Sequence, residues 1–364
     1  MKGIAEPIRL VEVVPETELP PVPAPPSAKR RVGERRLLLG IALAVALAAG
    51  IVAVVWARGD DAEPIVVAPN SVGIIDPATN KVVDTVPVGD SPGPIAAGAG
   101  ALWVVNLNDR TLTKIDPSAH SAVESIAVPV PSGRLTPPLL VAAAGEDVWI
   151  WACHQTLFRV DPVSIQIVQQ LELLRAFGVF PGFTCAVAAE KGSVWVPLGY
   201  PRAEVVHVEA AGDAPAAVAE RFPARLGSRS AMAIGLGSIW LAAGKGPVQR
   251  LDPATGDITG TVQLGSGPKA IAVGHDATWV VNEDEGSITR IDPRTNSVVR
   301  SISVGADPVG LAVGSDAIWV ANSGDGTVSR IDSETNTVTK TINVGHRPLG
   351  VAVANGLVWV TVRS

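Results

Sequence analysis

Between residues 64 and 364, hydrophobic residues come in short runs separated by polar turns. The clearest marker is a Trp inside an apolar segment, as in LWVVN, VWIWA, VWVPL, IWLAA, TWVVN, IWVAN and VWVTV. Seven such residues recur at intervals of about 40 to 46: Trp103, Trp149, Trp195, Trp240, Trp279, Trp319 and Trp359. A period of this length is typical of a repeat protein built from small sheets.

The segments between the Trp positions alternate between apolar and polar residues. In residues 338–344 (VTKTINV), Val338, Ile342 and Val344 share one parity and the Thr residues share the other. This period of two, rich in Val, Ile and Thr, predicts a strand with one buried face. The same alternation recurs at 82–88, 258–264 and 298–304.

Four short strands per repeat, separated by turns, predict an all-β fold, a seven-bladed β-propeller over residues 71–364. An open solenoid of sheets is the alternative. The chain ends after a Trp strand, and its first strands, about 71–76 and 81–88, can complete that last blade, which would leave no exposed edge. The stretch IVVAP at 65–69 competes for a place in the same blade.

An uninterrupted apolar run precedes the repeats. Residues 37–57 carry no charge and are long enough to cross a bilayer, where the backbone must be helical. Basic residues stand before the run, from Lys29 to Arg36, and acidic residues follow it. We therefore expect a single transmembrane helix with the N-terminus in the cytoplasm and the propeller extracytoplasmic. A cleaved signal peptide is the alternative, although the run exceeds a usual signal core.

These limits divide the chain into four parts. Residues 1–36 form a cytoplasmic stub with a Pro-rich spacer at 19–27, residues 37–57 the helix, residues 58–70 a linker, and residues 71–364 the propeller. Within the stub, Lys2 to Glu16 (KGIAEPIRLVEVVPE) resembles the last strand of class III nucleotide cyclase domains. That resemblance implies a tail of a longer cyclase-propeller signalling protein, but it brings no cyclase activity to this chain.

A second repeated motif keeps step with the Trp strands in six copies, and a seventh copy, at 205–213 (VVHVEAAGD), is degenerate. The six copies read IIDPATN at 74, KIDPSAH at 114, RVDPVSI at 159, RLDPATG at 250, RIDPRTN at 290 and RIDSETN at 330. Asp followed by Pro suits a type I turn, so these acids are interpreted as turn residues and not as catalytic pairs. Together the motifs resemble the YVTN-type β-propeller repeat family over nearly all of residues 64–364. The resemblance implies the fold, since the functions of that family are diverse.

The net charge and the cysteine content limit the partners and the covalent links that we expect. A net charge of -6 gives no overall basic surface, so we expect no nucleic-acid partner. The two cysteines, Cys153 and Cys185, are too few for a disulfide framework. Both are expected near one face on adjacent blades, where extracytoplasmic oxidation favours a disulfide between them over two separate buried thiols.

Candidate ligand-binding residues lie in the loops of one face, where Gly-x-x-Pro turns and the ends of the Trp strands meet. Several of these loops are long and carry arginines, which suit an anionic or polar partner. Alternatively, the arginines are ordinary loop residues without a ligand, and the repeated Asn residues cap the ends of strands. The candidates are Asn106, Arg134, His154, Arg175, Arg202, Lys269, Asn282, Asp307, Asn322 and Arg347.

No catalytic constellation, metal site or cofactor is predicted, because the five histidines fall in different blades. The expected function is a membrane-anchored sensor or scaffold that binds an extracytoplasmic small molecule or protein. A lyase resembling virginiamycin B lyase is an alternative, although the metal and His that family needs cannot be matched residue by residue. A purely structural assembly propeller is the third hypothesis.

Overall fold

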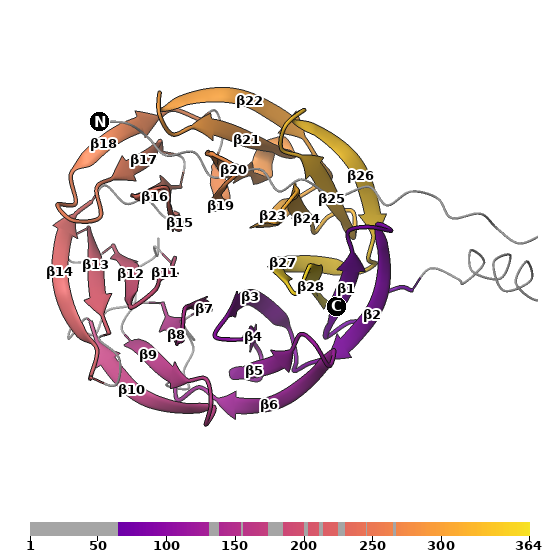
Figure 1. Cartoon of the computed structure of the whole chain (residues 1–364), viewed down its shortest axis with the longest axis horizontal. Coiled ribbons are helices and arrows are strands. Elements are labelled where there is room, and N and C mark those ends of the chain that lie inside the picture. Colours follow the sequence, from indigo (N-terminus) through magenta and orange to yellow (C-terminus); the bar gives the residue numbers. More distant parts are fainter. Residues whose placement is uncertain are drawn as a thin grey trace, which may run out of the picture. The chain divides into compact units, whose positions relative to one another are not determined.

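The computed structural model describes residues 65–130, 138–153, 156–173, 185–199, 203–210, 214–224, 230–244, 246–264 and 267–364. Residues 64–364 form one compact unit. Seven four-stranded antiparallel sheets surround a common axis, which confirms the predicted seven-bladed propeller (Figure 1). The predicted stub and transmembrane helix lie outside the described residues. Within the described ranges, no helix is long and apolar enough to cross a membrane.

Each blade runs from an innermost to an outermost strand. Blade 1 contains β3 (Pro92–Gly98), β4 (Ala101–Asn106), β5 (Thr111–Asp116) and β6 (Ser121–Ala127). Blade 2 contains β7 (Leu139–Ala144), β8 (Asp147–Ala152), β9 (Thr156–Asp161) and β10 (Gln166–Glu172). Blade 3 contains β11 (Ala188–Glu190), β12 (Ser193–Leu198), β13 (Glu204–Glu209) and β14 (Ala217–Pro223). Blade 4 contains β15 (Ser230–Gly235), β16 (Ser238–Ala243), β17 (Val248–Leu251) and β18 (Ile258–Val262).

The remaining three blades follow the same plan. Blade 5 contains β19 (Pro268–Gly274), β20 (Ala277–Asn282), β21 (Ser287–Asp292) and β22 (Ser297–Ser303), with the short 3-10 helix η1 (Glu283–Glu285) after β20. Blade 6 contains β23 (Pro308–Val313), β24 (Ala317–Asn322), β25 (Thr327–Asp332) and β26 (Thr337–Asn343). Blade 7 contains β27 (Arg347–Ala354), β28 (Leu357–Arg363), β1 (Ser71–Asp76) and β2 (Lys81–Pro87).

Blade 7 is built from both ends of the propeller sequence, as predicted. Its strand order is β2-β1-β28-β27, and Val72 pairs with Thr361 across the junction of β1 and β28. The stretch 65–69 does not compete for this blade. Instead, the Val67 amide donates to the Val344 carbonyl at 3.2 Å, and the Val67 side chain is fully buried. The ring is therefore sealed without an unpaired strand in its interior.

The repeated Trp occupies one architectural position. In each blade it lies in the second strand from the axis, and all seven copies are at most 4% exposed. These large side chains fill the space between neighbouring blades together with Val, Ile and Leu. Burial of aromatic and aliphatic surface is the main favourable contribution to folding, so this position explains the spacing of the pattern.

The repeated Asp closes the turn between the third and fourth strands. Its carboxylate accepts a hydrogen bond from the backbone amide two residues later, as from Ala78 to Asp76 at 2.9 Å and from Glu334 to Asp332 at 2.9 Å. Backbone amides of this kind lower the pKa of Asp161, Asp292 and Asp332. The interpretation of these acids as turn residues is confirmed.

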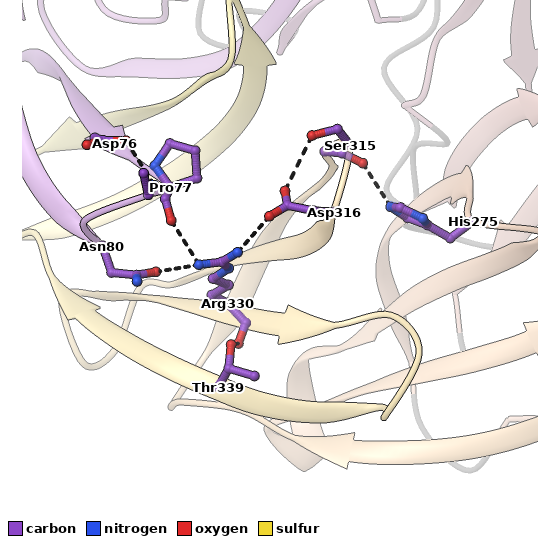
Figure 2. Close-up of polar contacts among 10 residues, drawn as sticks. Asp76, Pro77, Asn80, His275, Ser315, Asp316, Arg330 and Thr339 are labelled. Atoms are coloured by element: carbon purple, nitrogen blue, oxygen red, sulfur yellow. Dashed lines mark hydrogen bonds and ion pairs between the residues drawn. The ribbon is translucent and has the colours of Figure 1, made fainter.

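A basic residue opposite the Trp links most blades to the next. It lies 5.4–5.9 Å from the Trp ring in five blades, as Lys114, Arg159, Arg250, Arg290 or Arg330. Its nitrogen atoms then reach a backbone carbonyl of the following blade, for example from Lys114 to Pro162 at 2.7 Å. Figure 2 shows Arg330 between Asp316 of its own blade and the Pro77–Asn80 turn of blade 7.

Candidate functional site

A cavity of about 700 Å³ opens on the axis of the ring. Its walls come from the beginnings of the innermost strands and from the residues that end the second strands, so it lies on the face where the sequence predicts binding loops. Its charged and polar lining residues are Lys269, Glu283, Asp307, Ser323, Arg347 and Arg363, and residues from blades 1 and 2 complete it. A concave site of this volume is in the range that binds small organic ligands.

Two arginines stand side by side at the edge of this cavity. Arg347 begins β27, Arg363 ends β28, and the two are paired in register. In the described part of the chain, neither guanidinium has a hydrogen bond or ion pair. Burial lowers the pKa of Arg363, and the charge of Arg347 lowers it further. Both side chains nevertheless remain cationic, because a guanidinium group is not deprotonated in proteins. Blade 7 thus presents two uncompensated positive charges.

Blades 5 and 6 do not share this positive charge. In blade 5, Lys269 donates to both carboxylate oxygens of Glu283, at 3.0 and 3.1 Å, so this pair is largely neutral. In blade 6, the exposed Asp307 adopts a left-handed backbone conformation with φ of 47° in the loop before β23. The edge of the cavity therefore varies from neutral at blade 5 to acidic at blade 6 and basic at blade 7.

The deeper wall is apolar. Ile95, Leu140, Leu311, Leu349 and Val351 line it from the innermost strands of blades 1, 2, 6 and 7. Close approach of these strands explains the glycines among them. A Cβ at Gly350 would lie 2.6 Å from the Gly93 carbonyl oxygen, and one at Gly310 would lie 2.0 Å from that of Leu349. Only glycine fits where the inner strands crowd the axis.

Three of the predicted binding residues line this cavity: Lys269, Asp307 and Arg347. The sequence reasoning missed Glu283, Ser323 and Arg363. Each of these occupies the fourth position after its blade Trp, and Leu107 has the same position in blade 1. That shared spacing is the signal that could have identified them, because the residue at or just past the end of the second strand opens onto the axis.

The repeated asparagines have a different position. Asn106, Asn282 and Asn322 stand three residues after the Trp and are at most 2% exposed. Each donates from Nδ2 to two hydroxyl groups of the adjacent strand, as from Asn322 to Thr327 at 3.0 Å and Ser329 at 2.9 Å. The structure therefore places these three beneath the face, as links between strands, and not among the residues that line the cavity.

The other predicted binding residues, Arg134, His154, Arg175 and Arg202, lie outside the described residues. Cys153 follows β8 and Cys185 precedes β11, and the structure joins their sulfur atoms in a disulfide with a Cα–Cα distance of 5.3 Å. This bond connects blade 2 to blade 3. Over the described ranges, no group of three or more His, Cys, Asp and Glu side chains is placed to hold a metal ion.

Comparison with known proteins relates the chain to solved propeller structures. The sequence matches no family model and no curated protein. The fold is similar to apo AztD from Citrobacter koseri, with 14% identity, coverage of 78% of this chain and 81% of that chain, and a TM-score of 0.51. A second structure of Citrobacter koseri AztD is 15% identical over 74% of this chain and 76% of its own, with a TM-score of 0.50.

BamB from Moraxella catarrhalis is also similar, at 15% identity over 82% of this chain and 94% of that chain, with a TM-score of 0.51. In all, 1527 solved chains match, and a fold shared so widely does not specify one activity. At these identities, the comparisons show the propeller fold alone.

Proposed function

We propose that the chain is a binding module, in which the axial cavity takes up an extracytoplasmic ligand and the ring serves as the rigid scaffold. The observation that carries this proposal is the pair Arg347 and Arg363, two cations without an acidic partner at the edge of a concave site. Arg330, in contrast, is paired with Asp316. Unpaired charges beside a cavity are typical of ligand recognition.

The location of this module is part of the proposal. The apolar run 37–57 and the basic residues before it support a single-pass anchor with the propeller outside the cytoplasm. A disulfide between Cys153 and Cys185 is compatible with an oxidising compartment. The repeat motifs support assignment to the YVTN-type propellers, and the N-terminal segment supports a signalling partner on the cytoplasmic side.

A melting screen of the purified full chain tests the binding function. Ligand that binds only the native state raises the Tm by mass action. We expect at least one small organic compound to raise the Tm in a dose-dependent manner, and the increase to be lost in Leu311→Trp, which fills part of the cavity. A compound that raises the Tm of the unaltered protein and of Leu311→Trp equally binds outside the cavity. If a screen of acids, amines, sugars and short peptides gave no compound whose effect depends on the cavity, the proposal would be contradicted.

Fusions at the C-terminus test the location. Alkaline phosphatase is active only outside the cytoplasm, and green fluorescent protein exported through the general secretory route does not fluoresce. The proposed topology predicts an active phosphatase fusion and a dark fluorescent-protein fusion in the membrane fraction. The reverse pattern would refute the extracytoplasmic location without affecting the binding function.

A further inference from the structure

The lining of the axial cavity has a cationic part and an apolar part, and this combination restricts the class of ligand that can bind. Cationic side chains of blade 7 stand at its edge, whereas the wall below them consists of Ile95, Leu140, Leu311, Leu349 and Val351. A ligand complementary to both parts must carry negative charge at one end and apolar surface at the other. Neither an inorganic ion nor a neutral hydrocarbon satisfies both.

The arginine pair favours a planar anion with two oxygen atoms. Guanidinium groups donate in a fork that matches a carboxylate, and hydrogen bonds between charged groups are roughly twice as strong as neutral ones. Arg347 and Arg363 carry like charges and are paired across β27 and β28, so they repel one another. A carboxylate between them removes this repulsion, and the partial burial of Arg363 strengthens the attraction.

The apolar wall favours a short hydrocarbon body on this anion. Three of its side chains, Ile95, Leu311 and Leu349, are only partly covered by protein, so a ligand can still bury surface on them. Each methylene group that leaves water for this wall adds to the affinity. A free inorganic phosphate would leave this wall in contact with water and gain nothing from it.

We propose that the axial cavity binds a small organic carboxylate, with the carboxylate held by Arg347 and Arg363 and the apolar body packed on Ile95, Leu311 and Leu349. The inference rests on the proposed binding function and specifies its ligand class. Asp307, on the neighbouring blade, makes the cavity edge unfavourable for a second negative charge nearby, so a monocarboxylate fits better than a dicarboxylate.

Isothermal titration of the full chain with matched probes tests the ligand class. The probes are 4-methylpentanoate, its neutral amide 4-methylpentanamide, 4-methylpentylamine, acetate and inorganic phosphate. We expect 4-methylpentanoate to bind at least tenfold more tightly than the amide, the amine and acetate. This comparison uses the unaltered protein, so it does not depend on any variant folding.

Substitutions then locate the two halves of the site. Arg347→Gln and Arg363→Gln should each reduce the affinity for 4-methylpentanoate at least tenfold. Arg300→Gln, on the exposed outermost strand β22, is the matched control and should leave binding unchanged. Leu311→Gln should reduce the preference for 4-methylpentanoate over acetate while acetate binding itself persists. The Tm of each variant verifies that it is folded.

The outcomes separate this inference from the proposed function. Equal binding of acid and amide, or tighter binding of the amine or of phosphate, would overturn the carboxylate assignment. A sugar or amine hit from the melting screen that depends on Leu311 would leave the binding function intact and refute the ligand class. Failure of every probe and every screened compound would refute both.

Discussion

At the scale of single residues, the basic side chain opposite the Trp in five blades makes two contacts at once, one with the Trp ring and one with the next blade. Arg330 lies 5.5 Å from the Trp319 ring and also donates to Pro77 and Asn80 of the next blade. The alternation of the strands predicts which face such a residue shares with the Trp, because cross-strand neighbours lie on one side of the sheet. It cannot predict the partner in the next blade, which the curvature of the ring brings close.

Loss of this link should destabilise the protein. Arg330→Gln removes the stacking on Trp319 and the charge-assisted bonds to Asp316 and the Pro77–Asn80 turn. We expect a loss of about 1–3 kcal/mol of unfolding free energy and a lower Tm, measured by thermal denaturation. The control is Arg294→Gln, whose side chain is 88% exposed and should change the Tm little. Equal effects of the two changes would show that the link contributes nothing.

Blade 3 differs at the same position and should confer pH sensitivity. His207 replaces the basic residue and stacks on Trp195 with a centroid distance of 4.5 Å. Burial lowers its pKa, and the charges of Glu209 and Glu220 oppose this only in part. Because the folded-state pKa lies below the ordinary value of about 6.5, the unfolded state binds more protons in this window. Stability is therefore full above pH 6.5 and falls as pH drops through the folded-state pKa.

The measurement is the Tm between pH 7.5 and pH 5. We expect it to decrease in this range, and His207→Gln should show a smaller decrease. Exposed His346 provides the control, and His346→Gln should keep the full decrease. If the Tm of the His207→Gln variant fell with pH as steeply as that of the unaltered protein, His207 would not be the source of the pH dependence.

At the scale of elements, the strands follow directly from the pattern of the sequence. The predicted strands at 71–76 and 81–88 are observed at Ser71–Asp76 and Lys81–Pro87. The outermost strand β2 alternates between buried and exposed residues, whereas β1 lies inside the blade and is buried along nearly its whole length. The candidate site was only partly predictable. Asn106, Asn282 and Asn322 stand out in the sequence because they repeat, but they repeat because each of them links two adjacent strands. The residues that line the cavity at the next position vary in chemistry, as Glu283, Ser323 and Arg363 do, so only their spacing from the Trp marks them and no repeated residue type does.

The link between blades 2 and 3 gives a prediction at this scale. Cys153 and Cys185 should be oxidised in the native protein, so titration of the unfolded, unreduced chain should find no free thiol. Closing a loop with a sequence separation of 32 residues stabilises by about 3–4 kcal/mol in the chain-entropy model. Reduction should therefore lower the Tm, and the double change Cys153→Ser with Cys185→Ser should make the Tm insensitive to reductant. Two reactive thiols in the unreduced protein would contradict the pairing.

At the scale of the whole molecule, closure of the ring creates the site. Blade 7 takes β27 and β28 from the end of the sequence and β1 and β2 from the start of the propeller. The Thr361 hydroxyl donates to the Gly93 carbonyl at 2.8 Å, which joins this blade to blade 1. Closure therefore brings Arg347 and Arg363 next to Ile95, although these residues stand at opposite ends of the propeller sequence. The number of Trp repeats predicts the ring, but the cavity depends on which loops meet at its axis.

Hydrogen exchange of the full chain tests this closure most directly. Peptides covering Ser71–Asp76 should be as well protected as those covering a central strand such as Ala101–Asn106, because β1 is paired on both sides, to β28 and to β2. Rapid exchange throughout Ser71–Asp76 and Leu357–Arg363, with protection retained in blades 1 to 6, would show that the two ends do not pair. In that case neither the sealed ring nor the cavity it forms would exist.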